Sequence, residues 1–206
     1  MQANIRKLKA DDIARIYPYM VTDFPDNERK PQKMIEDSFE SGFMEGYALC
    51  QEEDVSVTDG SGIRGELLAY AFFVKLGDVL LFDYLAVLPD YRESGLGSIF
   101  LEELRKYLTG YECVIGEVEN PDYCTDPEEK KAMERRIRFY LKNGVRDTGA
   151  SGQVYTVEYR FFELIGRKKH SPEEAMERIG RFYHTYWPRQ EDYDKHVVMH
   201  VSPGAR

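Results

Sequence analysis

The sequence predicts a single α+β domain in which a mixed sheet is flanked by helices. Predicted strands outnumber predicted helices in the central region, strand–turn–strand segments occur early, and one strand–helix–strand unit lies in the middle of the chain. The 206 residues, of which 42% are hydrophobic and 32% charged, are enough to bury a core without metals or disulfides.

The first half of the chain is rich in predicted strands. The alternating segment 4–9 predicts a strand, and Asp11 or Asp12 can cap a helix over 13–20. The other elements expected in this half are a loop over 24–31, a helix over 33–43 that ends at Gly42 and Gly46, strands over 47–53, 67–75 and 80–87, and turns over 58–62 and 76–79.

The second half of the chain alternates between helices and strands. A helix over 98–108 leads to a strand over 112–121, and a helix that begins at Asp126-Pro127 is expected to end at Gly144. The remaining predictions are a long strand over 154–165, a helix from Ser171 to Trp187 and a short edge strand over 194–201. We expect residues 1–165 to form the domain and residues 166–206 to form a C-terminal helix and tail packed on it.

Charge and composition disfavour some classes of partner. The formal net charge of −9 disfavours nucleic acid, whose phosphates need a basic face, and weakly favours cationic substrates. No apolar run approaches the roughly 20 residues of a membrane span, and the N-terminal residues lack the apolar core of a signal peptide. We therefore expect a cytoplasmic protein with no membrane partner.

The cysteines and histidines predict no metal site. Cys50, Cys113 and Cys124 form no CxxC pair and are expected to be reduced, with Cys124, in a polar loop, left open as a reactive thiol. The histidines lie in the C-terminal part and lack metal-ligand spacing with cysteine. They are His170 and His184, together with His196 and His200, which are expected at the surface.

The segment Arg92-x-x-Gly95-x-Gly97 stands between a predicted strand and a predicted helix. Backbone amides at a helix N-terminus bind phosphate, glycines let a ligand approach the backbone, and Arg92 adds a fixed charge. This pattern indicates a phosphate-binding loop, although an ordinary surface turn is the other interpretation.

Two well-known phosphate loops do not fit this segment. A Walker A loop needs Lys and then Ser or Thr after its last glycine, whereas Ser98 and Ile99 follow here. A Rossmann fingerprint needs a small residue where Phe100 stands. Because Glu117 lies about 20 residues further on, where that fingerprint has its acidic residue, dinucleotide binding stays open as a minor alternative.

The segment LAVLPDYRESGLGSIFLEELRKYL (85–108) resembles motif A of the GNAT acyltransferase superfamily, and RFYLKNGV (138–145) resembles that family's ending helix. The resemblance implies the GNAT fold, with a mostly antiparallel sheet, over about residues 5–165. It also implies that the loop binds the pyrophosphate of acetyl-CoA through backbone amides. Met133 and Val145 stand where the family often has asparagine and phenylalanine. The residues implied for acetyl-CoA binding are Leu85, Ala86, Val87, Arg92, Glu93, Ser94, Gly95, Leu96, Gly97 and Ser98.

Acyl transfer from a thioester to an amine needs a neutral amine, a polarised carbonyl and protonation of the departing thiolate. The resemblance implies that Tyr140 supplies the proton. Strand alternation places Glu117 and Glu119 on one face, so we expect Glu117 to bind or deprotonate the acceptor, with Glu119 and Asp83 as further acceptor-binding residues. The alternatives are a solvated face or ion pairs with Arg135, Arg136 or Arg138.

The leading hypothesis is an acetyl-CoA-dependent N-acetyltransferase that moves an acetyl group directly from CoA to an amine of a small molecule or peptide. The alternative is a non-catalytic acyl-CoA-binding module that acts as a sensor or interaction domain. Transfer to a hydroxyl and formation of a homodimer also stay open. The partners expected are acetyl-CoA and an amine acceptor, with no nucleic acid and no metal.

Overall fold

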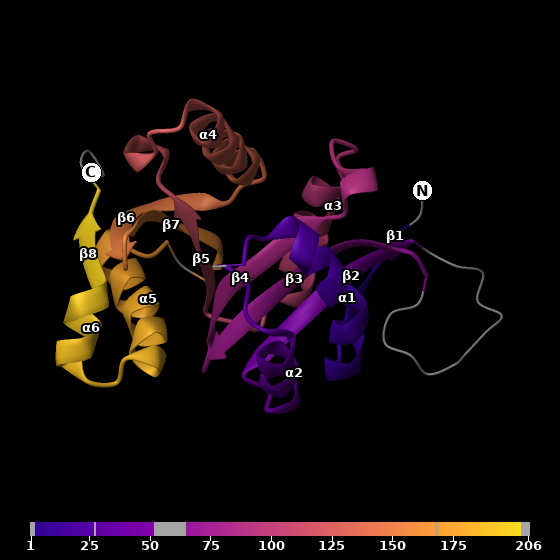
Figure 1. The fold of residues 1–206 in the computed structure, drawn as a ribbon, viewed down its shortest axis with the longest axis horizontal. Coiled ribbons are helices and arrows are strands. Elements are labelled where there is room, and N and C mark those ends of the chain that lie inside the picture. The colour runs from indigo at the N-terminus through magenta and orange to yellow at the C-terminus, as the bar shows by residue number, and fades with distance from the viewer. Residues whose placement is uncertain (1–2, 27, 52–64, 168, 203–206) are drawn as a thin grey trace. The chain divides into compact units, whose positions relative to one another are not determined.

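The computed structural model describes residues 3–26, 28–51, 65–167 and 169–202. Its elements form two compact units, one made of Met1–Lys75 with Phe82–Tyr107 and the other of Leu76–Leu81 with Leu108–Arg206. Antiparallel strands flanked by helices in each unit confirm the predicted α+β class (Figure 1). The expected turn over 58–62 lies outside the described residues. The expected boundary at residue 165 stays a prediction, and residues on both its sides belong to the second unit.

The first unit contains β1, β2 and most of β3 and β4, in the order β1-β2-β3-β4, and β1 pairs with β2, and β2 with β3, in antiparallel orientation. Most residues of β2 and β3 are buried, and for β3 the nearly continuous hydrophobic sequence predicts this burial. Tyr70 and Phe72 of β3 are fully buried, with ring centroids 5.6 Å apart. The bounds are β1 (Ala3–Lys7), β2 (Met44–Gln51), β3 (Leu67–Leu76) and β4 (Val79–Val87).

The helices of the first unit are α1 (Ala10–Asp23), α2 (Gln32–Glu40) and α3 (Leu96–Tyr107). The expected cap of α1 is wrong: Lys9 is the N-cap, and Asp12 instead accepts the Lys9 amide at 2.8 Å. Gly46 does not end a helix as expected but lies within β2. A side chain there would come within 2.8 Å of the Phe39 ring, so α2 packs against β2 through this glycine.

The second unit contains strands in the order β5-β7-β6-β8, all paired antiparallel. Its strands are β5 (Cys113–Glu119), β6 (Arg146–Val154), β7 (Val157–Gly166) and β8 (Val197–Val201). The strand expected over 154–165 is largely confirmed as β7, but it begins only at Val157, because the chain turns at Tyr155, where φ is 53°, and Val154 ends the strand β6, which was not predicted. The sequence RDTGASGQV of β6 is polar and rich in glycine, and it becomes a strand through its pairing with β7 and β8 on either side.

The helices of the second unit are α4 (Pro127–Lys142), α5 (Pro172–Tyr186) and α6 (Gln190–His196). The side chain of Asp126 accepts two amides of the first turn of α4 at 2.9 Å, and Gly144, with φ of 73°, follows its C-terminus, as predicted. The strand expected over 194–201 is only partly right, since its first residues belong to α6 and the edge strand β8 begins at Val197.

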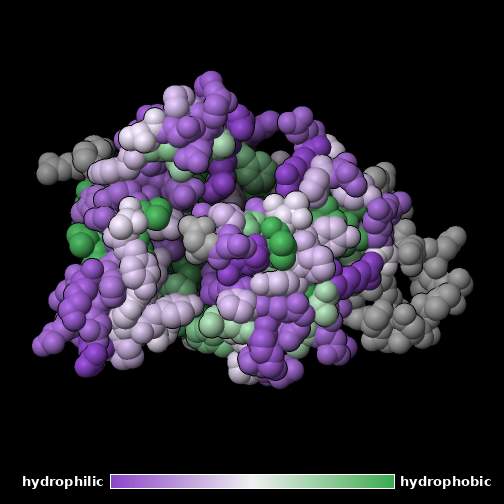
Figure 2. Space-filling view, viewed as in Figure 1, coloured by the Kyte–Doolittle hydropathy of each residue, from purple (hydrophilic) through white to green (hydrophobic). Residues whose placement is uncertain are grey.

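Hydrophilic side chains predominate on the molecular face in Figure 2, and hydrophobic side chains appear there in small patches. Within the described ranges, no helix combines the length and the apolar character that crossing a membrane requires.

Candidate functional site

The predicted phosphate loop joins β4 to α3 in the first unit. A short 3-10 turn at Pro89–Tyr91 follows β4, and Glu93 and Gly95 then adopt left-handed backbone conformations with φ of 62° and 84°. Arg92, Glu93, Ser94 and Gly95 are exposed before α3 begins at Leu96. Because the first amides of a helix have no acceptor within the helix, this loop has the donors that an anion needs.

The space around Gly95 suits the approach of a ligand. A Cβ atom built on Gly95 would meet no heavy atom within 4 Å. The Gly95 carbonyl accepts the amides of Ser98 and Ile99 at 3.0 and 3.3 Å, which holds the loop against the first turn of α3. The residues therefore fit a phosphate group that approaches from solvent.

Arg92 anchors the loop to its own unit. Its Nη2 lies 2.5 Å from Asp23 Oδ1, at the end of α1, and its Nε donates to the Val87 carbonyl at 3.1 Å. The Asp23 side chain is only 2% exposed and also accepts the Tyr70 hydroxyl at 2.8 Å. Burial and the Asp23 carboxylate raise the pKa of Tyr70. Asp23 therefore already compensates Arg92, and a direct contact between Arg92 and phosphate stays a prediction.

Tyr140 lies in the last turn of α4, with its ring centroid 5.4 Å from that of Phe139. The side chain is half-buried, and desolvation of the hydroxyl raises the pKa of Tyr140 to about 12, although the charge of Arg136 acts in the opposite direction. The hydroxyl therefore keeps its proton at neutral pH, as a proton donor must.

The three predicted carboxylates have different partners. Within the first unit, the two carboxylate oxygens of Asp83 each accept a hydrogen bond from Lys30 Nζ at 2.7 Å, and this pair is largely buried. In the second unit, Glu119 lies 3.4 Å from Arg136 Nη1, which is one of the ion pairs named as an alternative. Cations thus compensate Asp83 and Glu119.

Glu117 has a different kind of partner. The hydroxyl of Tyr183, in α5, lies 2.8 and 2.7 Å from its two carboxylate oxygens. No sequence signal predicts this contact, because the two residues are 66 positions apart and the segment after residue 165 matches no motif.

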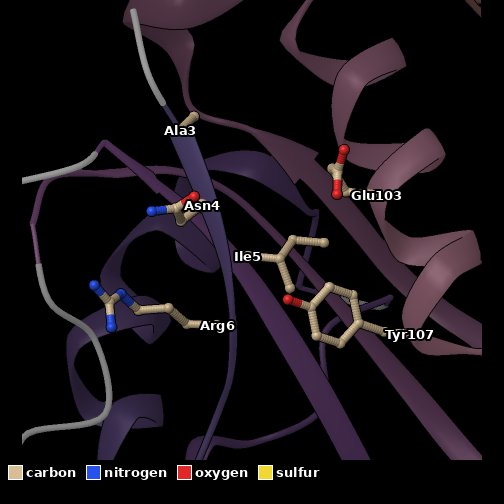
Figure 3. Close-up of a pocket in the computed structure, with 6 residues that line it drawn as sticks. All are labelled: Ala3, Asn4, Ile5, Arg6, Glu103 and Tyr107. Atoms are coloured by element: carbon tan, nitrogen blue, oxygen red, sulfur yellow. The ribbon is translucent and has the colours of Figure 1, made fainter.

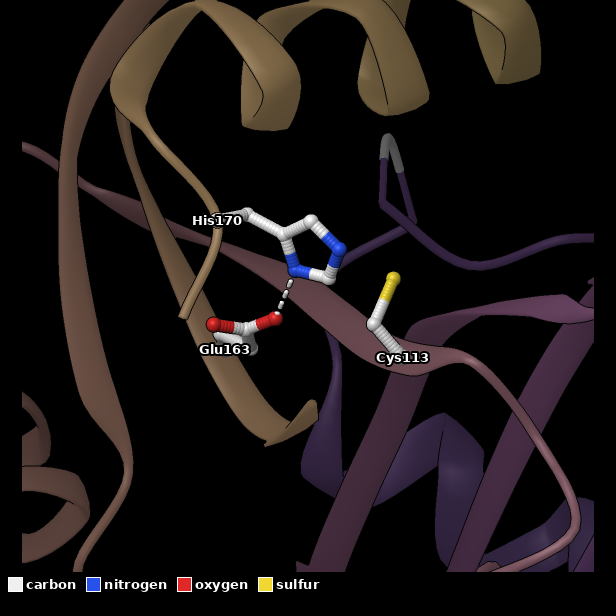
Figure 4. A group of neighbouring side chains, drawn as sticks. All are labelled: Cys113, Glu163 and His170. Carbon is white, nitrogen blue, oxygen red and sulfur yellow. Dashed lines mark hydrogen bonds and ion pairs between the residues drawn. The ribbon is translucent and has the colours of Figure 1, made fainter. Parts of the chain in front are cut away.

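Cys113, Glu163 and His170 form a buried group whose potential ligand atoms all lie within 4.8 Å of one another (Figure 4). Sequence spacing did not predict this grouping, because the fold brings together β5, β7 and the segment before α5. Figure 4 shows the contact between His170 Nδ1 and the Glu163 carboxylate.

Charged neighbours argue against a metal at this group. Arg146 pairs with Glu163, Arg178 pairs with Glu112, and His170 Nε2 lies 3.2 Å from Glu112 Oε1. Two guanidinium cations already compensate the carboxylates and would repel a divalent ion. The group therefore fits a structural ion network better than a metal centre.

Two other features differ from the expected site or surface. The expectation that His196 lies at the surface is only partly right, because it is half-buried and its ring centroid lies 5.0 Å from that of Trp187. A hollow of about 380 Å³ lies at β1 and α3, and none of the predicted site residues is among those that line it (Figure 3). The hollow is lined by Ala3, Asn4, Ile5, Arg6, Glu103 and Tyr107.

No protein-family model and no curated protein matches the chain. Several solved structures are similar to it. A Bacteroides thetaiotaomicron protein assigned to the GNAT family of acetyltransferases is 17% identical, with 88% of this chain and 96% of that one covered and a TM-score of 0.61.

Two further structures have more specific descriptions. Arabidopsis thaliana NAA60 in complex with acetyl-CoA is 16% identical, with 79% of this chain and 97% of that one covered and a TM-score of 0.56. The ribosomal-protein-S18-alanine N-acetyltransferase of Escherichia coli is 18% identical, with 82% of this chain and 99% of that one covered and a TM-score of 0.51. These likenesses confirm that the chain has the GNAT fold.

Proposed function

We propose that this GNAT-fold chain is an acetyl-CoA-dependent N-acetyltransferase that moves the acetyl group directly to an amine of a small molecule or peptide. The observation that carries the proposal is the loop before α3, in which Arg92–Gly95 are exposed and left-handed conformations at Glu93 and Gly95 lead into the N-terminus of the helix. It is supported by similar structures that include an acetyl-CoA complex and an N-acetyltransferase.

In the proposed complex, the pyrophosphate of acetyl-CoA accepts hydrogen bonds from backbone amides of the loop. Leu85, Ala86 and Val87, at the end of β4, hold the part of the carrier nearer to the thioester. Asp23 keeps Arg92, and with it the loop, in place before acetyl-CoA arrives. Such preorganisation lowers the cost of ordering the loop on binding.

Glu117 is proposed to bind the amine and accept its proton, because a lysine-like amine with a pKa of about 10.4 is almost entirely protonated at pH 7. The neutral amine nitrogen then forms a bond to the acetyl carbon while the bond between that carbon and sulphur breaks, and the proton that the nitrogen loses on forming the amide passes through water to the departing thiolate. Glu119 and Asp83 are the weaker candidates for acceptor binding, since Arg136 and Lys30 already compensate them.

Tyr140 is proposed to donate to the departing sulphur. Its pKa of about 12 lies well above the roughly 8.5 of an ordinary thiol, so complete proton transfer to the thiolate is uphill. Tyr140 therefore acts mainly through a hydrogen bond that strengthens as negative charge develops on sulphur.

The test is release of CoA thiol from acetyl-CoA in the presence of a panel of amines, with acetyl-CoA binding measured in parallel. Tyr140→Phe should lower kcat roughly 10- to 100-fold, the effect of one hydrogen bond to a charged group, and leave acetyl-CoA affinity unchanged. Tyr123→Phe is the matched control, because Tyr123 is 61% exposed.

The possible outcomes separate the hypotheses. Binding of acetyl-CoA without amine-dependent thiol release would favour the non-catalytic module, and absence of acetyl-CoA binding would refute the proposal. A change in kcat below about threefold for Tyr140→Phe, far less than a positioned donor contributes, would remove Tyr140 from the mechanism.

A further inference from the structure

The strongest unassigned feature is the contact between the C-terminal segment and Glu117. Tyr183 donates one hydroxyl proton, and its oxygen lies 2.8 and 2.7 Å from the two carboxylate oxygens, so both share the donor. A hydroxyl centred on both oxygens fixes the direction in which the carboxylate points. Glu117 itself is half-buried.

The ring of Tyr183 is held firmly in turn. Tyr183 is 8% exposed, its ring stacks on Trp187 with centroids 5.9 Å apart and an angle of 22°, and it meets Phe182 edge-on at 5.2 Å. Trp187 also contacts Tyr155, in the turn between β6 and β7, with centroids 5.3 Å apart. Packing of this kind restricts a side chain to one rotamer and gives its hydroxyl a defined position.

We infer that Tyr183 is a positioning residue for Glu117 in acetyl transfer, so that α5 completes the acceptor site. The inference rests on the proposed function. Because the Tyr183 hydroxyl is a neutral donor, this contact orients the carboxylate without cancelling its charge.

A purely structural role for Tyr183 makes different predictions. If the hydroxyl only ties α5 to β5, its removal lowers stability and changes no kinetic constant selectively. If it positions Glu117, its removal raises KM for the amine and leaves acetyl-CoA affinity unchanged. The effect should also vanish once Glu117 has lost its charge.

The experiment compares steady-state kinetics and thermal unfolding of wild type, Tyr183→Phe, Glu117→Gln and the double variant. Tyr183→Phe keeps the aromatic ring and should raise KM for the amine roughly tenfold, the effect of one charge-assisted hydrogen bond. In the Glu117→Gln background the same change should have less than about a twofold effect, because the two residues act as one unit. Tyr193→Phe is the matched control, since this hydroxyl contacts the sulphur of Met199 at 3.9 Å.

Equal kinetics of Tyr183→Phe and wild type would overturn the inference and leave the proposed function standing. The inference would also be overturned if Tyr183→Phe raised the KM for the amine by the same factor in the Glu117→Gln background as in wild type. A wild-type protein that binds acetyl-CoA but acetylates no amine would overturn both. If Tyr183→Phe unfolds, Glu117→Asp gives the second test: it withdraws the carboxylate from the hydroxyl without altering the aromatic packing, and a KM for the amine equal to that of wild type would refute the inference.

Discussion

Gly95 offers the sharpest test of the loop, because its backbone conformation can be separated from its packing. Its φ of 84° is left-handed, and a Cβ there would meet nothing within 4 Å. Gly95→Ala therefore introduces a backbone cost and no steric clash. A left-handed alanine costs about 1–2 kcal/mol, and the lower conformational entropy of the unfolded alanine variant offsets about 0.4–1 kcal/mol of this loss.

We therefore expect Gly95→Ala to lower the free energy of unfolding by about 1 kcal/mol, which corresponds to a fall in Tm of about 2–4 °C for a chain of this length. If the loop relieves this strain by moving, its amides leave the position that phosphate needs. Loss of one hydrogen bond to a charged group should weaken acetyl-CoA binding about tenfold. Thermal unfolding and calorimetric titration with acetyl-CoA measure the two effects.

Two glycines of the same chain provide matched controls. Gly42 also has open space and a left-handed φ of 73°, so Gly42→Ala should lose similar stability without affecting acetyl-CoA binding. Gly110 has open space and no left-handed φ, so Gly110→Ala should change neither the stability nor the binding of acetyl-CoA. If Gly95→Ala and Gly42→Ala weaken binding equally, or if Gly95→Ala leaves binding unchanged, the reasoning about the loop is wrong.

Three further predictions concern packing, capping and thiol reactivity. Gly46→Ala should lower the free energy of unfolding by about 1–3 kcal/mol, measured in denaturant, because its Cβ would lie 2.8 and 2.9 Å from two phenylalanine rings. Asp126→Ala should cost about 1 kcal/mol in the same assay through loss of the α4 cap, and an unchanged midpoint would contradict the capping role. Burial raises the pKa of Cys50 and Cys113 to about 11, so both stay protonated at pH 8 and should react with iodoacetamide far more slowly than Cys124. Their labelling should accelerate as pH rises toward 11, and equal labelling of all three thiols in the native state would refute this.

Local signals predicted those elements whose ends are encoded nearby. The Asp126-Pro127 start and the Gly144 end of α4 were correct because a cap and a left-handed residue act within a few positions. The strand β6 was missed because its polar, glycine-rich sequence has little strand preference of its own and depends on pairing with β7 and β8.

Site partners were harder to predict than site residues. The sequence pointed to Arg92, Asp83 and Glu117, but their partners lie 69, 53 and 66 positions away. Sequence periodicity does not predict contacts between residues so far apart in the chain, because these contacts depend on how distant elements pack. The ion pair of Glu119 with Arg136 was open as an alternative, since both residues belong to adjacent predicted elements.

These partners change what the net charge of −9 means for the acceptor. A general excess of acidic residues attracts cations only weakly, because salt screens charges beyond about 10 Å at 0.1 M ionic strength. Recognition of an amine therefore depends on local charge. Lys30 and Arg136 compensate Asp83 and Glu119, whereas the contact that orients Glu117 comes from a phenol and carries no positive charge. A cationic donor neutralises a carboxylate and weakens its attraction for a second cation, so Asp83 and Glu119 are the weaker candidates for binding the acceptor amine in the proposed function.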